Sequence, residues 1–184
     1  MATSGDRLVW VLRHAKTSAS PPPGGSDFDR RLTARGKRDA DALGDRLAAG
    51  ADRLGMKKAQ IPELVLCSSA ARTTQTAARV WARAQGSPPI EHLRTLYHAS
   101  SEEVLGQLRL IDDEVRSVMV VGHNPTVHNL VADLIRPDDE AGRASVVLQG
   151  FPTCALAVFE VPAPGWADLA EGSAMLLGLF LPPF

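Results

Sequence analysis

Two residues that can bind an anion stand directly after a short apolar run near the start of the chain. Residues Leu8 to Leu12 are apolar without interruption, and Arg13-His14 follows them. An apolar run of this length is typical of a buried strand, and open α/β sheets bind ligands beyond the carboxyl ends of their strands. A guanidinium beside an imidazole at such a place forms an anion site with a candidate nucleophile. Taken alone, the pair is equally well explained as a basic surface turn, because short motifs match by chance.

The same arrangement occurs twice more along the chain. The apolar run that ends at Cys67 leads into a helical pattern with Arg72 in its first turn, and the run Ser117 to Val121 leads into Gly122-His123 and another helix. The helix dipole does not favour a cation at a helix N-terminus, so the arginine there suggests a bound anion, although taken alone it is better explained as a surface arginine whose stem packs on the helix. Strands that alternate with helices pair in parallel, which places all three junctions at one edge of the sheet. Two arginines and two histidines are therefore expected to converge on a tetrahedral phosphate, whose oxygens match guanidinium geometry.

Hydrophobic patterning predicts the elements that must position these side chains. The alternation of strands and helices predicts an α/β fold of three layers, with a mostly parallel central sheet and helices on both faces. We expect one domain over residues 1–184, because a chain of this length fits a single core. Thr33 is expected to cap a helix from about residue 34 to about residue 51, with an apolar face from Ala40 to Leu54. The other expected elements are a helix capped by Ser69, an extended segment from Ile90 through His98, a helix capped by Ser100 with Ile111 on its apolar face, a helix with Asn124 as N-cap and Pro125 as first residue, strands over Ser145–Leu148, Thr153–Val161 and Met175–Leu181, and a helical turn near Trp166.

Composition excludes several classes of function. The chain has 20 Lys and Arg against 21 Asp and Glu, for a net charge of −1, which favours neither a nucleic-acid partner nor a membrane-surface helix. The longest apolar run, residues 174–181, is too short to cross a bilayer, and the N-terminus lacks a secretory signal pattern, so a cytoplasmic protein is expected. Cys67 and Cys154 lie in apolar runs and are expected to be reduced core residues. The pair Asp27 and Asp29 follows a Pro/Gly-rich loop rather than a buried strand, which argues against a metal site, and we expect no metal and no cofactor.

Four motifs, in order along nearly the whole chain, resemble those of the histidine phosphatase superfamily, which has the phosphoglycerate-mutase-like fold. These motifs are Arg13-His14-Ala15-Lys16-Thr17, Asp29-Arg30-Arg31-Leu32-Thr33-Ala34-Arg35-Gly36, the segment Ser68 to Ala77 around Arg72, and Gly122-His123-Asn124. The short length, Leu96-Tyr97, Asn124-Pro125 and the apolar C-terminal strands are similar to the small SixA-type phosphohistidine phosphatases. The resemblance implies a metal-independent phosphatase that forms a covalent phosphohistidine on the enzyme.

The same resemblance implies a role for each candidate residue. His14 is the expected nucleophile, and Arg13, Arg72 and a protonated His123 are expected to stabilise the charge on the transferred phosphoryl group. Thr17 and Asn124 are expected to complete the phosphate pocket.

A departure from the larger relatives bears on the substrate. Those relatives carry a glutamate proton donor, and the matching segment Leu93 to His98 contains no acid. An alkoxide leaves poorly without a proton, whereas the P–N bond of phosphohistidine is labile once the ring is protonated. Hydrolysis of protein phosphohistidine is therefore the expected activity.

Two other functions stay open. The chain could be a phosphatase of small phosphomonoesters in which His98 or Glu102 donates the proton. It could also be a non-catalytic module that binds phosphate, although binding alone does not need a nucleophilic histidine. In each case the expected partner is a phosphorylated protein or a small phosphorylated molecule, with no nucleic acid and no membrane.

Overall fold

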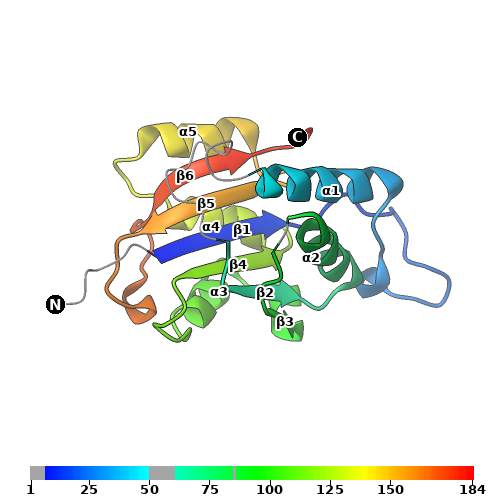
Figure 1. The fold of residues 1–184 in the computed structure, drawn as a ribbon, viewed down its shortest axis with the longest axis horizontal. Helices are drawn as coiled ribbons and strands as arrows, with labels where there is room; N and C mark the ends of the chain where they lie inside the picture. The colour runs from blue at the N-terminus through cyan, green and yellow to red at the C-terminus, as the bar shows by residue number, and fades with distance from the viewer. Residues whose placement is uncertain (1–6, 50–60, 85) are drawn as a thin grey trace.

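A six-stranded sheet with strand order β3-β2-β4-β1-β5-β6 forms the centre of the protein (Figure 1). The computed structural model describes residues 7–49, 61–84 and 86–184. The strands are β1 (Arg7–Arg13), β2 (Leu64–Ser68), β3 (Ile90–Leu93), β4 (Ser117–Gly122), β5 (Leu156–Val161) and β6 (Met175–Phe180). The pairs β1–β4, β2–β4 and β2–β3 are parallel, whereas β1–β5 and β5–β6 are antiparallel. The predicted α/β fold with a mostly parallel sheet is confirmed.

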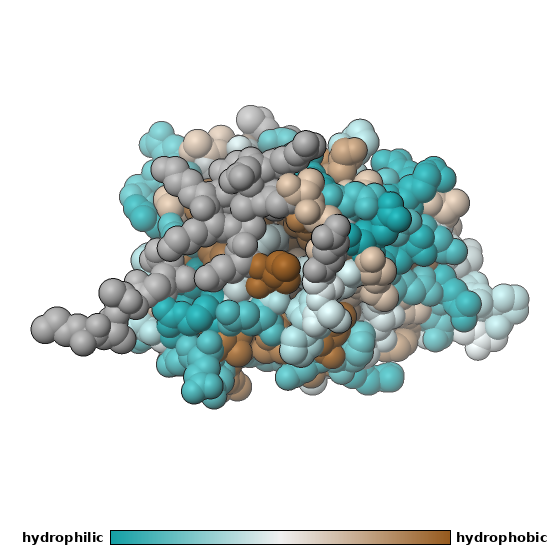
Figure 2. All heavy atoms as spheres, in the orientation of Figure 1, coloured by the Kyte–Doolittle hydropathy of each residue, from teal (hydrophilic) through white to brown (hydrophobic). Residues whose placement is uncertain are grey.

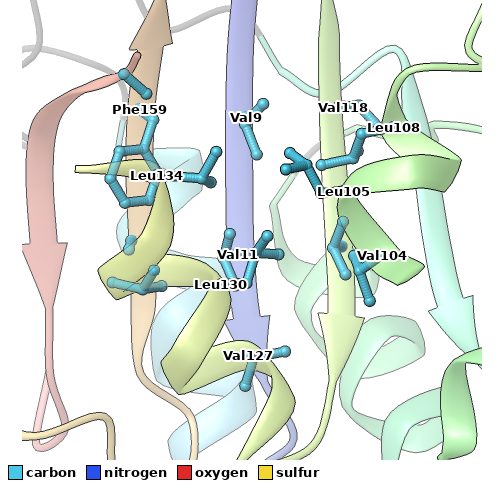
Figure 3. Packing of buried hydrophobic residues seen from close by; sticks show 14 of the residues in the cluster. Val9, Val11, Val104, Leu105, Leu108, Val118, Val127, Leu130, Leu134 and Phe159 are labelled. Carbon is cyan, nitrogen blue, oxygen red and sulfur yellow. The ribbon is translucent and has the colours of Figure 1, made fainter. Parts of the chain in front are cut away.

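Helices cover both faces of this sheet. They are α1 (Ala34–Ala48), α2 (Ala71–Arg83), α3 (Ser101–Leu108), α4 (Thr126–Leu134) and α5 (Glu140–Gln149), and short 3-10 turns occur at η1 (Asp27–Asp29), η3 (Arg94–Tyr97) and η4 (Trp166–Asp168). One core lies between the sheet and α3, α4 and α5, where Val9 and Val11 of β1 meet Leu105 and Leu130 (Figure 3). The second core lies between the other face of the sheet and the pair α1 and α2. Figure 2 shows hydrophilic residues over the outward side of α1, as expected for a helix with one buried face.

The strand register brings the predicted junctions together. Arg13, the last residue of β1, pairs with Gly122, the last residue of β4, and Cys67 of β2 pairs with Val121. His14 and His123 therefore follow neighbouring parallel strands at the same edge of the sheet, and α2 begins beside them at Ala71. This is the geometry that the alternating pattern predicted.

The loop after His14 is held against the start of α1. Thr33 caps this helix through its hydroxyl, as predicted, and its backbone N–H donates to Lys16 O at 2.9 Å. A Cβ on Gly36 would lie 2.0 Å from the same carbonyl oxygen, so only glycine lets the first turn of α1 approach this closely. The predicted end of this helix, with Leu54 on its apolar face, lies outside the described residues.

Two segments adopt a different structure from the one the sequence predicts. The segment Ser145–Leu148 is part of α5 rather than a strand, because Asp139 caps a helix there; Val146 faces the core, while Val147 is 80% exposed. Thr95 to His98 does not continue the extended segment, because η3 turns the chain at Arg94–Tyr97.

Four predicted element boundaries shift by one to three residues. Ala70 caps α2 in place of Ser69, whose backbone N–H still donates to Leu93 O beside β3. Pro125 stands at the N-cap of α4 in place of Asn124, whose side chain turns to a neighbouring carbonyl. Strand β5 begins at Leu156 rather than Thr153, because Cys154 has left-handed backbone with a φ of 66°. Helix α3 ends at Leu108, so Ile111 packs on the core from beyond the helix.

Several other predictions are confirmed. Ser100 caps α3 with Glu103 in a capping box, a 3-10 turn forms at Trp166, and β6 lies at the edge of the sheet. Cys67 and Cys154 are both free and buried. Among the described residues, no helix has the length and apolar character needed to span a membrane.

Candidate active site

His14 follows β1 and is held by its own backbone. Its N–H donates to Gly122 O and its carbonyl accepts from Cys154 N–H, both at 3.1 Å. The ring Nδ1 lies 2.8 Å from Ala15 O. A carbonyl oxygen can only accept, so Nδ1 carries the ring proton and Nε2 keeps a free lone pair. A backbone carbonyl thus fixes the tautomer, as expected for a nucleophile.

The charge state of His14 suits the same role. The ring is buried, with 7% of the residue exposed. Burial, together with the positive charges of Arg72 and Arg13, lowers the pKa of His14 to about 4, against the raising effect of the Ala15 carbonyl. The imidazole is therefore neutral and nucleophilic at neutral pH.

Arg72 and His123 form a hydrogen-bonded pair beside that ring. Arg72 Nε donates to His123 Nδ1 at 3.1 Å, so Nδ1 is an acceptor and the proton of a neutral ring sits on Nε2, 2.9 Å from Ser68 Oγ. The centroids of the His14 and His123 rings are 5.2 Å apart. Burial, followed by the charge of Arg72, lowers the pKa of His123 to about 3. His123 is therefore neutral in this arrangement, because a guanidinium contacts the nitrogen that would take the second proton, and its protonation beside a phosphoryl group stays a prediction.

Arg13 and Asn124 meet at one backbone carbonyl. Arg13 NH1 and Asn124 Nδ2 donate to Phe151 O at 2.8 and 3.0 Å, respectively. The charge of Arg13 lowers the pKa of both active-site histidines, which places its guanidinium near them. Within the described part of the chain, the buried atoms Arg13 Nε and Asn124 Oδ1 have no hydrogen-bond partner. Each residue therefore has one polar atom at the site that is still available for a hydrogen bond.

Two other predicted residues lie differently. The hydroxyl of Thr17 donates to Arg31 O at 3.0 Å, toward the segment that leads into α1, so its contact with phosphate stays a prediction. The ring of His98 packs against Tyr97 with centroids 4.2 Å apart and lines the pocket described below. Its role as a proton donor also stays a prediction.

Asp27 is a site residue that sequence reasoning missed. Its Oδ2 accepts from Arg72 NH2 at 3.0 Å and from the Tyr97 hydroxyl at 2.6 Å, and its backbone carbonyl accepts from Arg72 NH1 at 2.7 Å. Its Oδ1 accepts from Arg30 NH1 at 2.8 Å. These hydrogen bonds from Tyr97 and Arg30, with the charge of Arg72, hold the pKa of Asp27 far below its usual value. Its neighbour Asp29 instead accepts from Ser26, so the two carboxylates do not act as a pair.

An open pocket of about 530 Å³ extends from this group of side chains. Its lining includes Arg72, His123, Asp27, Tyr97 and His98, together with Glu103 and Asn124. Glu102, the other acid considered from the sequence, is exposed on α3, and Glu103 lines the pocket in its place. The arrangement offers an unprotonated imidazole nitrogen, two guanidinium groups and room for the remainder of a substrate.

Comparison with known proteins identifies the class to which this site belongs. The model of the histidine phosphatase superfamily (branch 1) matches residues 9–107, more than half of the chain. The chain belongs to this superfamily, and it is a phosphatase.

Three of the solved structures that are similar over nearly the whole chain carry the SixA name. A protein from Nakamurella multipartitia assigned as phosphohistidine phosphatase SixA is 29% identical with a TM-score of 0.80, covering 98% of each chain. A protein from Agrobacterium tumefaciens with the same assignment is 34% identical with a TM-score of 0.76, covering 97% of this chain and 100% of that one. The protein histidine phosphatase SixA complexed with tungstate is 25% identical with a TM-score of 0.72, covering 95% and 97%.

Proposed function

We propose that this phosphatase hydrolyses phosphohistidine in proteins through a covalent phosphohistidine on His14. The observation that carries the proposal is the ring of His14, which is buried, neutral and fixed by Ala15 O with Nε2 unprotonated. Nε2 attacks phosphorus in line with the bond to the leaving group, and water then hydrolyses the enzyme phosphohistidine. The three SixA-type structures above support a protein phosphohistidine substrate.

The phosphoryl oxygens are stabilised by the neighbouring donors. Arg72 and Arg13 supply positive charge and N–H groups, each preorganised donor contributing about 10²–10³ in rate. His123 supplies a neutral ring, and a phosphate dianion beside it would raise its pKa toward protonation during the reaction. Because the two arginines neutralise the phosphoryl charge, we propose that hydrolysis needs no metal ion. Asn124, whose Oδ1 has no partner among the described residues, completes the pocket wall.

The acids at the pocket favour a phosphoramidate over an alkyl ester. Asp27 is held as a carboxylate by Tyr97, Arg30 and Arg72, and Glu103 accepts from the Ser100 N–H in a helix cap that lowers its pKa. Neither group holds a proton for an alkoxide at neutral pH. Phosphohistidine does not need one, because its ring can already carry the proton.

The first test removes the nucleophile. His14→Ala should abolish phosphohistidine hydrolysis and the acid-labile phosphoenzyme, while the circular dichroism spectrum is retained. His92→Ala, an exposed histidine on β3, is the matched control and should retain full activity. Near-normal turnover by His14→Ala would contradict the mechanism, and a wild-type protein that binds phosphate without forming a phosphoenzyme would indicate a binding module.

A second candidate function is hydrolysis of small phosphomonoesters, favoured by the position of His98 in the pocket lining. If His98 donates a proton, wild-type protein should hydrolyse an alkyl phosphate as fast as a phosphohistidine peptide. His98→Ala should then reduce only the alkyl phosphate reaction. A preference for the phosphohistidine peptide would support the first proposal instead.

A further inference from the structure

Asp27 places a carboxylate beside the arginine and the histidine of the candidate active site. It stands on η1, its carboxylate contacts Arg72, and it lines the same pocket as Arg72 and His123. An in-line reaction expels the leaving group on the side of phosphorus opposite the nucleophile. The ring of His14 is buried and is not among the described residues that line the pocket, so the pocket offers the space for a leaving group.

The Asp27 carboxylate has room for one more hydrogen-bond donor. An ionised carboxylate offers about four acceptor positions. Oδ2 uses two of them for Arg72 and Tyr97, and Oδ1 uses one for Arg30. The side chain is 53% exposed, so the remaining position on Oδ1 is open to an incoming group.

The charge of the pocket lining narrows the kind of leaving group. Among the described residues that line it, Arg72 is the one Lys or Arg, and both Asp27 and Glu103 are acids. A leaving group with a second phosphate or a carboxylate would meet these two acids without a cation of its own. A leaving group that presents an N–H would meet an acceptor.

We propose that Asp27 is a specificity-determining residue that binds the second ring N–H of a protonated phosphohistidine and so selects phosphoramidate over phosphoester substrates. This inference rests on the proposed function, because it assigns the leaving group of the same reaction. As Nε2 of His14 bonds to phosphorus, the P–N bond of the substrate breaks and its electron pair stays on the substrate nitrogen. The other ring nitrogen keeps its proton, so histidine leaves as a neutral imidazole and needs no proton from the enzyme.

The Asp27 carboxylate does not promote hydrolysis of a phosphate ester. An alkyl phosphate leaves as an alkoxide unless an acid protonates it. Asp27 is surrounded by Arg30, Arg72 and the Tyr97 hydroxyl, which keep it ionised. Asp27 can therefore accept a hydrogen bond from a leaving imidazole but cannot donate a proton to a leaving alcohol.

The test compares two substrates on one enzyme. Asp27→Asn removes the charge and keeps the shape, and it should lower kcat/KM for N-phosphoimidazole and for a phosphohistidine peptide by about tenfold, the size of one half-exposed charged hydrogen bond. The kcat/KM for an aryl phosphate should fall less than the kcat/KM for the two phosphoramidates, because an aryl leaving group needs no N–H acceptor and is affected only by what the substitution changes at Arg72. Asp27→Glu restores a carboxylate and should recover part of the preference. Asp45→Asn removes a surface carboxylate that pairs with Arg83 and should leave both substrates unaffected.

The outcomes separate the inference from the proposed function. An equal loss on both substrates by well-folded Asp27→Asn, judged by its thermal melt, would overturn the inference and show that Asp27 acts only by positioning Arg72. The same activity as wild type on both substrates would also overturn the inference. A wild-type enzyme that ignores the phosphohistidine peptide but hydrolyses alkyl phosphates would overturn the proposed function itself.

Discussion

Two arginines are almost completely buried, one at each end of the sheet. Arg7 begins β1, its side chain is 1% exposed, and it donates to three backbone carbonyls and to Asp113 Oδ1 while its guanidinium lies over the Trp166 ring. Arg72 lies in the first turn of α2, beside the carboxyl ends of the parallel strands. Its side chain is 8% exposed, and it donates to His123 and Asp27. The same residue type thus has two different surroundings.

The two guanidinium groups differ in whether a ligand could replace their hydrogen-bond acceptors. The acceptors of Arg7 are mostly carbonyls of the turns around residues 113–115 and 164, which belong to the fold itself. The acceptors of Arg72 include side chains that line an open pocket, so phosphate oxygens can compete for its N–H groups. Burial alone does not distinguish a structural arginine from a functional one, whereas the nature of the acceptors does.

The largest expected effect is a loss of activity when Arg72, at the carboxyl ends of the parallel strands, is replaced. Arg72→Ala should lower kcat/KM for a phosphohistidine peptide by about 10²–10³, because it removes preorganised donors to the phosphoryl oxygens. Steady-state kinetics on protein of verified fold measures this loss. The control Arg79→Ala removes an arginine of the same helix that pairs with Asp41 and should retain activity. A loss below about fivefold would contradict the role assigned to a preorganised donor.

At the amino end, the expected effect is on stability. Arg7→Met should lower the free energy of unfolding by about 2–4 kcal/mol, because it removes the buried guanidinium that donates to three part-buried carbonyls and to Asp113. Urea unfolding measures this change, and kcat/KM of the folded variant should stay close to wild type. Arg136→Ala, which removes a surface pair with Asp138, should change stability by less than about 0.5 kcal/mol. If Arg7→Met impairs catalysis while stability is unchanged, Arg7 has a functional role and the contrast with Arg72 does not hold.

The pH dependence of stability should also distinguish the two ends of the sheet. His14 and His123 have pKa values of about 4 and about 3 in the folded protein against an ordinary value of 6.5. Above pH 6.5 both rings are neutral in the folded and unfolded states, and as pH falls toward 4 the unfolded chain binds protons that the folded protein does not. Each histidine should therefore reduce stability by at most about 1.4 kcal/mol per pH unit in that window.

Urea unfolding between pH 7 and pH 4 measures this slope. His123→Gln should flatten the curve, and Arg7→Met should lower it uniformly because that substitution leaves both histidines in place. A His123→Gln curve parallel to that of the wild type would show that the ring is not buried in its neutral form.

The three strand-to-helix junctions could be predicted from the sequence because parallel strands leave few alternatives. Once β1, β2 and β4 are recognised as apolar runs, Arg13, Arg72 and His123 must meet at one edge. Asp27 could not be predicted, because it reaches Arg72 through a 3-10 turn after a Pro/Gly-rich loop whose path no periodicity encodes. The charge of His123 could not be predicted from the sequence either, because it depends on the orientation of Arg72 Nε.

The errors in the fold have a common physical origin. The apolar run at Val146 and Val147 is too short for its spacing to separate a strand from a helix, and the Asp139 cap decided the outcome. The helix starts at Ala70 and Pro125 moved by one residue because the backbone of Ser69 and the side chain of Asn124 had other partners. Long apolar runs were predicted correctly because burial in the sheet leaves them one solution.

The backbone clamp on His14 has a consequence for the fate of the phosphoryl group. His14, the proposed nucleophile, lies between hydrogen bonds to Gly122 and Cys154, in a segment fixed by β4 on one side and by the approach to β5 on the other. A phosphorylated ring on such a segment could not move far enough to reach a second protein. Under the proposed function, the protein therefore ends a series of phosphoryl transfers rather than passing the group on, and the phosphoryl group leaves as inorganic phosphate.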